Sequence, residues 1–362
     1  MPRIGVNALY LIPGGVGGTE IYLRELLKAL AAIDSTNEYF VFTNLETDSD
    51  LVPKQSNFQW KPQAFHARFR PGRILWEQTV LPLEVARYRL DVLFNPGFNA
   101  PLLATCANVT TIHDLQHKRH PEYFRWFDLP FWKLMLWAAV HRSRSLIAVS
   151  ESTRSDLLFY YRFPAARAHV IYHGVDRAFF ALDRGAIEPF LLCVSTLHPH
   201  KNLERLIRAY AQKPRPEKLV LAGMKGFQTK EIEALIAKLK MQDRIQLTGW
   251  IPRAELVGLF ARAQAFVYPS TFEGFGMPVI EALAAGIPVA CSQIPPLKEI
   301  AGDAALFFDP TSEDAIAVAL DRILNDKPLR AKLQAAGPGQ ARPFHWTRAA
   351  EETLAVLLKS PH

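Results

Sequence analysis

The sequence predicts an α/β protein made of two doubly wound domains. Segments patterned as buried strands alternate with segments of helical periodicity along most of the 362 residues. This alternation starts at residue 3 and restarts at residue 189, and each start is a strand, a turn and a helix in that order. The length is sufficient for two ordinary domains with substantial cores. We expect the first domain to cover residues 1–180 and the second to cover residues 181–344.

The first domain is expected to open with a strand, a glycine loop and a helix. Residues 3–7 form a short apolar strand, residues 13–18 a glycine-rich loop, and four leucines then lie on one helical face: Leu23, Leu26, Leu27 and Leu30. Residues 39–43 and 91–95 are patterned as further strands. Residues 46–75 are polar, aromatic and proline-bearing without a clean period, so the structure is least predictable there.

Two later strands of the first domain run into polar residues. Residues 108–112 are rich in β-branched side chains and lead into His113 and Asp114, at the carboxyl edge where open α/β sheets bind ligands. Residues 145–150 form the next strand, and Ser150 is placed to cap the helix that follows. For an isolated histidine at such a strand end, a structural role would be the preferred interpretation.

The second domain repeats the alternation from residue 189 onward. Its expected strands are residues 189–195, 218–223, 244–249, 265–268, 289–290 and 305–308, and its expected helices include residues 203–210, 230–240 and 254–263. A polar turn with Lys201 follows the first of these strands. A lysine beside the start of a helix can neutralise a diphosphate.

The clearest strand, glycine loop and helix lie between residues 265 and 288. Pro278 suits a first helical turn and Gly286 suits a helix end, so the helix should begin directly after Gly276. The free N–H groups and the positive dipole end of such a helix attract phosphate. Glu273 lies in the loop and Glu281 inside the helix, and a carboxylate accepts two hydroxyls at once, which suits a sugar. A hydrolase-like acid/base pair and an ordinary capped helix are the alternatives.

The spacing of Glu273 and Glu281 resembles the E-x7-E motif of the retaining glycosyltransferases of family 4 (GT4), which have the GT-B fold. Flanking motifs recur in the same order along most of the chain. The resemblance implies two Rossmann-like domains that face each other across a cleft, and a C-terminal helix, expected at residues 345–362, that crosses back to the first domain. It implies transfer of a sugar from a nucleotide diphosphate sugar to a hydroxyl, with retention at the anomeric carbon.

The resemblance also assigns roles to single residues. His113 would contact a hydroxyl of the donor sugar, with Asp114 in a supporting or acceptor-side role. Lys201 would bind the donor phosphates, Glu273 the donor sugar and Glu281 the ribose. Further donor contacts are expected from Gly15, Gly17, Gly18, Thr196, His200, Trp250, Ile251, Phe275, Gly276 and Met277.

The sequence departs from the family at the phosphate-binding turn. Many members carry an arginine early in this turn or directly before the lysine, where this chain has Thr196 and His200. A protonated His200 would supply the missing charge. Because no Asp-x-Asp pattern is visible, we expect no catalytic metal and no cofactor other than the nucleotide sugar co-substrate.

Donor and acceptor are predicted only from overall likeness to bacterial mannosyltransferases of polysaccharide and lipopolysaccharide assembly. GDP-mannose is the first choice of donor, with UDP-sugars and dTDP-sugars as alternatives. The acceptor would be a glycan or a lipid-linked oligosaccharide. The apolar run at residues 134–140 is too short to span a bilayer, and the first residues lack the hydrophobic region of a signal peptide, so a cytoplasmic protein is expected.

The formal charge of +7 is too small and too dispersed to indicate a nucleic acid partner, and none is expected. Basic residues interleave with aromatic ones in two segments, around Phe69 and over residues 118–127. This pattern suits peripheral adsorption to an anionic membrane surface at the inner face, and solvated faces over core aromatics are the alternative. The three cysteines stand singly, and Pro121 interrupts the spaced histidines at 113, 117 and 120, so no metal site is expected.

Three other classes of protein compete with a transferase. A nucleotide-sugar epimerase of the same fold would isomerise its substrate without an acceptor. A catalytically silent module that binds nucleotide sugars would not need Glu273, Glu281 and Lys201 together. A two-domain solute-binding protein would require export, for which no signal segment is present.

Overall fold

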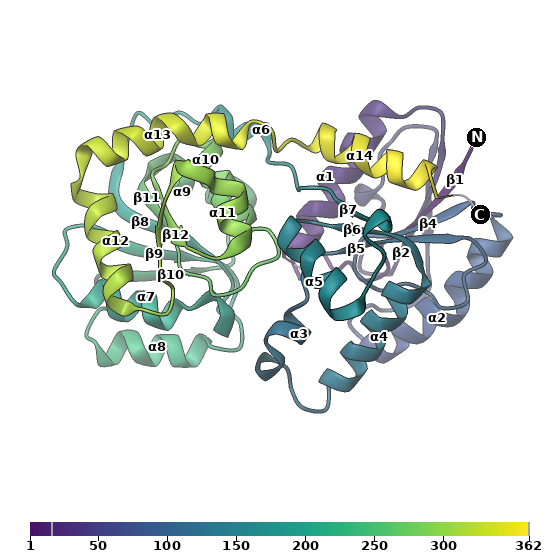
Figure 1. Cartoon of the computed structure of the whole chain (residues 1–362), viewed down its shortest axis with the longest axis horizontal. Coiled ribbons are helices and arrows are strands. Elements are labelled where there is room, and N and C mark those ends of the chain that lie inside the picture. Colours follow the sequence, from purple (N-terminus) through teal and green to yellow (C-terminus); the bar gives the residue numbers. More distant parts are fainter. Residues whose placement is uncertain (16, 361–362) are drawn as a thin grey trace. The chain divides into compact units, whose positions relative to one another are not determined.

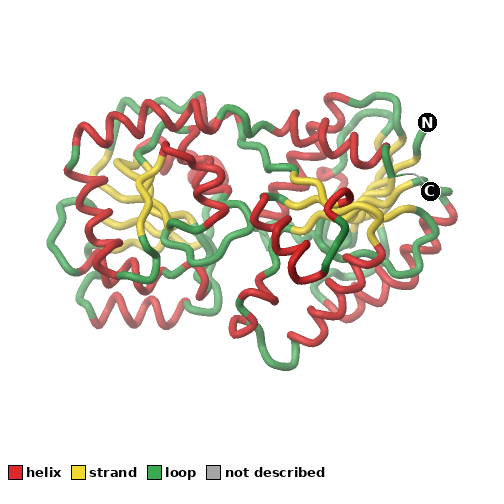
Figure 2. Tube along the Cα trace, in the orientation of Figure 1, coloured by secondary structure: helices red, strands yellow, loops and turns green. Residues whose placement is uncertain are grey.

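The computed structural model describes residues 1–15 and 17–360, and these divide into two compact units. Unit 1 comprises Met1–Gly174 and the C-terminal segment from Phe344, and unit 2 comprises Val175–Pro343. In each unit helices surround a central sheet (Figure 2). Of the glycine loop expected at residues 13–18, Val16 lies outside the described residues, as do residues 361–362 of the expected last helix.

The first segment of unit 1 ends at Gly174, six residues before the boundary that we expected at residue 180. The short helix α6 (Arg177–Phe180) belongs to unit 2 because it buries Phe179, whose ring packs edge-on against Phe260 at 5.1 Å. At the other junction, Phe344 belongs to unit 1 and not to the second domain. Its ring packs against Tyr172 at 5.4 Å.

Unit 1 has a seven-stranded parallel sheet in the order β3-β2-β1-β4-β5-β6-β7 (Figure 1). The strands are β1 (Arg3–Asn7), β2 (Glu38–Thr43), β3 (Phe58–Pro62), β4 (Val92–Asn95), β5 (Ala107–Ile112), β6 (Ser143–Ala148) and β7 (Ala168–Val170). The helices are α1 (Gly18–Ile33), α2 (Arg70–Arg87), α3 (Gln116–Arg119), α4 (Leu129–Arg142), α5 (Glu151–Tyr161) and α14 (Trp346–Leu358), with short 3-10 turns η1 (Ser49–Leu51), η2 (Pro121–Tyr123) and η3 (Ala165–Arg167).

Unit 2 has a six-stranded parallel sheet in the order β10-β9-β8-β11-β12-β13. The strands are β8 (Glu188–Val194), β9 (Lys218–Ala222), β10 (Ile245–Gly249), β11 (Ala263–Tyr268), β12 (Val289–Ser292) and β13 (Ala305–Phe308). The helices after α6 are α7 (Leu203–Ala211), α8 (Thr229–Lys238), α9 (Arg253–Arg262), α10 (Met277–Ala284), α11 (Pro295–Ala301), α12 (Glu313–Asn325) and α13 (Lys327–Ala341), with η4 (Pro199–Lys201) and η5 (Gly302–Ala304).

The central strands are apolar along their length because helices cover both faces of a parallel sheet. In unit 2, residues 265–268 of β11 are fully or almost fully buried, and so is every residue of β12. The chain order of the strands reverses once in each sheet, between β1 and β4 in unit 1 and between β8 and β11 in unit 2. Ligands of open α/β sheets bind beyond the carboxyl ends of the strands at such a reversal.

The region whose structure was least predictable from the sequence contains a regular strand. Residues 58–62 form β3 at the edge of the first sheet, paired only with β2, and their exposure alternates along the strand. An edge strand has a neighbouring strand on one side only and is less completely buried than a central strand. The five residues of β3 therefore lack the continuous apolar run that marks the central strands. Helix α2 then begins at Arg70, still inside the segment for which no period was found.

The C-terminal helix packs on unit 1, as the family resemblance implied. Helix α14 lies along α1, and the Trp346 ring stacks near His173 at 6.1 Å and tilts against Tyr22 at the same distance. Gly174 is required at this contact because a Cβ there would collide with the backbone of Trp346. Within residues 1–15 and 17–360, no helix has both the length and the apolar composition needed to cross a bilayer.

Candidate active site

The reversal of strand order in unit 2 brings two loops together. One follows β8 and carries Thr196, His200 and Lys201, and the other follows β11 and carries Glu273. The backbone oxygen of His200 accepts hydrogen bonds from the Thr271 N–H at 2.8 Å and the Ser270 hydroxyl at 3.0 Å. These bonds fix the turn of the first loop against the second. Most of the polar residues predicted for the donor site therefore lie at one edge of this sheet.

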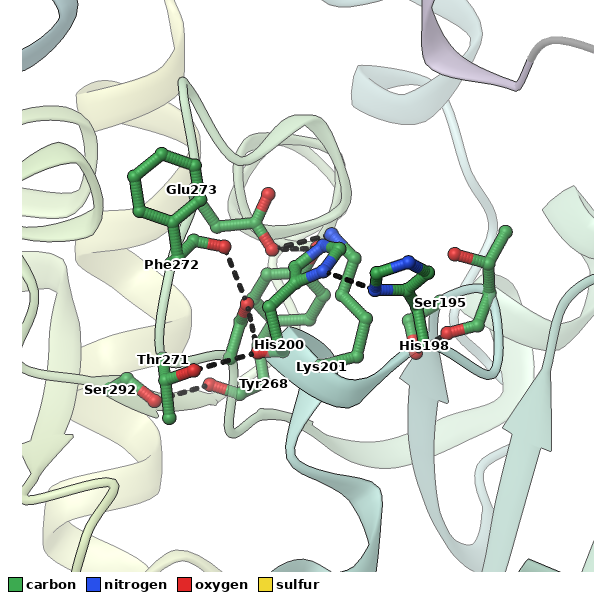
Figure 3. Close-up of polar contacts among 11 residues, drawn as sticks. Ser195, His198, His200, Lys201, Tyr268, Thr271, Phe272, Glu273 and Ser292 are labelled. Atoms are coloured by element: carbon green, nitrogen blue, oxygen red, sulfur yellow. Dashed lines mark hydrogen bonds and ion pairs between the residues drawn. The ribbon is translucent and has the colours of Figure 1, made fainter. Parts of the chain in front are cut away.

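Lys201, Glu273 and Tyr268 form a connected cluster at this edge (Figure 3). The Lys201 ammonium lies 2.6 Å from Glu273 Oε1 and donates to the Tyr268 hydroxyl at 3.1 Å. The Tyr268 hydroxyl donates to the same Glu273 oxygen at 2.8 Å. Burial, and next the negative charge of Glu273, raise the pKa of Tyr268, so its hydroxyl stays protonated and remains a donor.

Both charged members of this cluster are largely withdrawn from water. The side chains of Lys201 and Glu273 are 14% and 11% exposed, which makes their attraction stronger than that of a surface pair. A lysine ammonium has three N–H donors, and Glu273 and Tyr268 use two of Lys201's. A third donor is available for an anionic ligand. Tyr268 was missed by the sequence analysis, although its place at the end of a buried strand was the available signal.

Helix α10 begins after Gly276, as predicted from Pro278 and Gly286. Gly276 is the N-cap with φ at 112°, a backbone conformation that favours glycine, and a Cβ there would lie 2.5 Å from Leu297 Cδ2. No side chain caps this helix end in the part of the chain that the structure describes. Phe275 is buried beside the cap, and Met277 opens the helix. The positive end of the helix dipole thus lies at the same loop as Glu273.

Glu281 is held by an ion pair that the sequence did not predict. The carboxylate is buried inside α10, and Arg253 Nη1 donates to its Oε1 at 2.9 Å. Burial raises the pKa of Glu281, and the positive charge of Arg253 opposes this rise. Arg253 opens α9, two residues after Ile251, and Trp250 next to Ile251 has a 63% exposed side chain. The loop predicted to hold the nucleotide base therefore leads directly to the residue that binds Glu281.

His113 lies in unit 1 and is a neutral ring. Its Nε2 is 2.8 Å from the backbone oxygen of Pro96. Because a carbonyl oxygen only accepts hydrogen bonds, the ring proton is on Nε2, and Nδ1 is unprotonated. Burial lowers its pKa to about 4. The Tyr22 ring packs edge-on against it at 5.0 Å. Asp114, the next residue, accepts a hydrogen bond from the Gln116 N–H at 2.9 Å, which shapes the turn.

The glycine loop of unit 1 has open space around three of its glycines, Gly14, Gly17 and Gly18, as far as the described residues show. A Cβ added at any of these three would meet no atom of residues 1–15 and 17–360 within 4 Å, and Gly17 has φ at 61° as the N-cap of α1. Gly15 instead packs its backbone close to Ile12. The loop follows β1, one of the two strands at the reversal point of the first sheet. Open backbone at this place suits a ligand that approaches the chain closely.

The spaced histidines bind different partners. His113 contacts Pro96, His117 Nε2 is 2.8 Å from the Tyr161 hydroxyl, and His120 Nδ1 is 2.9 Å from a carboxylate oxygen of Glu122. Ser150 caps α5, where its hydroxyl accepts from the Thr153 N–H at 3.1 Å, as expected. The three cysteines, Cys106, Cys193 and Cys291, are buried free thiols.

Comparison with known proteins identifies the family. The family model described as Glycosyltransferase Family 4 matches residues 16–179, and the one described as Glycosyl transferases group 1 matches residues 176–340. The O-antigen chain mannosyltransferase B of Escherichia coli is 28% identical over 92% of this chain and 93% of that protein.

Solved structures support the fold over the whole chain. The sucrose-phosphate synthase of Thermosynechococcus elongatus superimposes with a TM-score of 0.79 at 21% identity and covers 99% of both chains. The Anabaena protein HepE, solved in complex with UDP and glucose, has a TM-score of 0.76 at 20% identity, covering 99% of this chain and 100% of that one. Since consecutive family models account for nearly the entire sequence and the structure has two Rossmann-like parallel-sheet units, the chain is a glycosyltransferase of the GT4 family with the GT-B fold.

Proposed function

We propose that this glycosyltransferase moves mannose from GDP-mannose to a hydroxyl of a glycan or lipid-linked oligosaccharide in cell-surface polysaccharide assembly, with retention at the anomeric carbon. The observation that carries the proposal is the cluster of Lys201, Glu273 and Tyr268 beside the N-terminus of α10. It combines a cation and a helix dipole for a diphosphate with a carboxylate for sugar hydroxyls. Support for mannose comes from the Escherichia coli relative, which is a mannosyltransferase.

The reaction needs stabilisation of the diphosphate that departs from the anomeric carbon. Lys201 would donate its third N–H to a phosphate oxygen, and the first turn of α10 at Gly276 and Met277 would face the same charge. Both groups are fixed by packing before the donor binds, so little reorganisation accompanies the reaction. Preorganised electrostatic groups of this kind are usually the largest single contribution to catalysis.

The remaining residues would hold the two ends of the donor. Glu273 would accept hydrogen bonds from hydroxyls of the sugar, and Glu281 would accept them from the ribose hydroxyls. The loop with Trp250 and Ile251 would hold the base. His113 is neutral, and its unprotonated Nδ1 would accept a hydrogen bond from a sugar hydroxyl. In the proposed route the leaving phosphate takes the proton of the acceptor on the same face of the sugar. A stable glycosyl adduct on Glu273, found by mass spectrometry, would contradict this route.

The donor proposal is tested by thermal unfolding with GDP, UDP, dTDP, ADP and their sugars, first without and then with a divalent metal. A ligand at a hundred times its dissociation constant adds about 2.7 kcal/mol to the free energy of unfolding. We expect GDP and GDP-mannose to raise the Tm without metal. If only UDP or dTDP compounds raised the Tm, the donor would be a sugar of that nucleotide and not GDP-mannose. If no nucleotide raised the Tm, the proposed donor site would be contradicted. Sugar isomers formed without acceptor would indicate an epimerase.

We also propose that α4 of unit 1 adsorbs to an anionic membrane surface, where a lipid-linked acceptor would lie. The helix is apolar on both faces: Met135, Leu136 and Ala139 are buried, whereas Leu134 and Trp137 are 59% and 51% exposed. Trp126 and Phe127, just before the helix, are 84% and 55% exposed. Exposed basic residues lie among them, namely Arg125, Lys133 and Arg142. Tryptophan and basic side chains together suit the interface of an anionic bilayer.

This surface is tested with vesicles of phosphatidylglycerol and of phosphatidylcholine. Replacing Trp126, Leu134 and Trp137 together by serine is expected to lower binding to the anionic vesicles about tenfold or more, since interfacial affinity scales with buried apolar area. Val318→Ser on α12 of unit 2, where the side chain is 56% exposed, is the matched control and should bind like the parent protein. Equal binding of the triple variant and the control would contradict the role of α4.

A further inference from the structure

Two histidines in the phosphate-binding turn form a direct pair (Figure 3). Nδ1 of His198 lies 2.7 Å from Nδ1 of His200, with the ring centroids 4.6 Å apart. Two ring nitrogens at this distance require one N–H and one lone pair, because two lone pairs or two N–H groups would repel each other. The geometry admits a neutral pair and a pair with one extra proton on an outer nitrogen. It excludes a doubly protonated pair, so the two rings hold at most one positive charge.

The pair titrates as a unit in a defined electrostatic environment. Burial, and then the positive charge of Lys201, lower the pKa of His198, which favours the neutral form of this ring when no ligand is bound. Glu273, in the loop after β11, partly neutralises the charge of Lys201, and the uncharged hydroxyl of Tyr268, at the end of β11, accepts a hydrogen bond from it. The ring of Phe227, which precedes α8, packs edge-on against His198 at 5.6 Å.

The turn that carries the pair is held in place by its backbone. The backbone oxygen of His200 accepts from both the N–H and the hydroxyl of Thr271, and the Lys201 N–H donates to the His198 oxygen at 2.9 Å. The pair therefore has a fixed position next to Lys201 and the loop that leads to α10. A diphosphate bound by Lys201 would carry one negative charge on each phosphate, and a single lysine balances one of them. The neighbouring Thr196 brings no charge.

We infer that the His198–His200 pair is the second cationic partner of the donor diphosphate and gains its charge by taking up one proton as the donor binds. This inference rests on the proposed function, in that the diphosphate must lie at this turn. The added proton turns the bond between the rings into a charge-assisted hydrogen bond, which is stronger than the neutral one. Neither histidine alone offers this stabilisation, and the sequence analysis had considered only His200.

Proton uptake gives donor binding a defined pH dependence. The pair takes up its proton more readily with the dianionic ligand bound than without it, so affinity is highest at acid pH and falls as the pH rises from the lowered pKa of His198 in the free protein through the higher pKa of the pair in the complex. One linked proton changes the dissociation constant by up to about tenfold per pH unit. We therefore expect the dissociation constant of the donor to increase about tenfold between about pH 6.5 and about pH 8.5.

The test is isothermal titration calorimetry with GDP-mannose, without acceptor, in two buffers of different ionisation enthalpy. A nucleotide sugar is used because its phosphates, unlike the terminal phosphate of GDP, do not titrate near neutral pH. At the pH where binding and protonation are most strongly coupled, the parent protein is expected to take up about one proton per donor bound. His200→Arg, which supplies a permanent charge, should bind with little proton uptake and nearly constant affinity across the pH range.

Two further variants separate a charge effect from a structural one. The double variant H198Q/H200Q should show no proton uptake and weaker binding at acid pH. His66→Gln is the matched control, because that ring is 72% exposed in unit 1, and it should keep the parent's uptake. Binding of GDP-mannose by the parent protein without proton uptake and with pH-independent affinity would overturn this inference and leave the donor site intact. Absence of binding by every nucleotide sugar at every pH would overturn the donor site itself.

Discussion

Replacing Lys201 by alanine is expected to lower kcat by on the order of a hundredfold or more, the usual effect of removing one preorganised group that stabilises transition-state charge. The ammonium lies at the carboxyl edge of the second sheet, paired with Glu273 of the loop that leads into α10. The charge on the departing diphosphate develops in the transition state, so kcat should fall more than the affinity for the donor changes. Initial rates at several donor concentrations measure both quantities.

A matched lysine distinguishes this effect from a loss of surface charge. Lys225 is in the same unit, and its side chain is 74% exposed beside Glu233. The Lys225→Ala variant should retain the parent's kcat. Circular dichroism and the Tm of both variants show whether the fold is preserved. If the Lys201→Ala variant were folded and had unchanged kinetics, Lys201 would have no role in catalysis.

Removing Arg253 is expected to destabilise unit 2 by about 3 kcal/mol near neutral pH, because a buried carboxylate would lose its counter-ion. This value is at the low end for buried pairs, since the Arg253 side chain is 37% exposed and water can approach the site. Glu281, by contrast, is buried inside α10. Chemical denaturation of the Arg253→Ala variant and of the parent protein measures the difference in the free energy of unfolding.

The pH dependence of this loss has a definite sign. Without Arg253, burial and the weaker effect of the negative charge of Asp176 act unopposed on Glu281 and raise its pKa further above the value in the unfolded chain. A carboxyl with a raised folded pKa stabilises the fold at low pH and loses that contribution as the pH rises through the folded pKa. The Arg253→Ala variant should thus approach the parent's stability in acid and differ most at neutral pH. In a Glu281→Gln background the same substitution should cost much less, and an equal cost would contradict the ion pair.

Local properties of the chain were sufficient to predict most elements of the fold. The start of α10 after Gly276 follows from a proline suited to the first helical turn and a glycine at positive φ, both of which act within a few residues. The central strands are likewise visible in the sequence, because burial on both faces demands a continuous apolar run. The strand β3 was not predicted, since an edge strand has no such requirement.

The sequence by itself proposed Lys201, Glu273 and Glu281 for the candidate site, and the tertiary structure alone decided how they pair and which further residues, such as Tyr268 and Arg253, join them. Lys201 and Glu273 are 72 residues apart, and the sequence places each at the end of a strand without saying that those strands are neighbours. In the folded sheet β8 and β11 are neighbours, so Lys201 and Glu273 form an ion pair and Tyr268 hydrogen-bonds to Glu273. These contacts follow from the order of the strands. The pairing of Arg253 with Glu281, which are 28 residues apart, arose in the same way. Each depends on distances between side chains, which are set only when helices and strands pack, whereas the identity of a loop residue is already present in the chain.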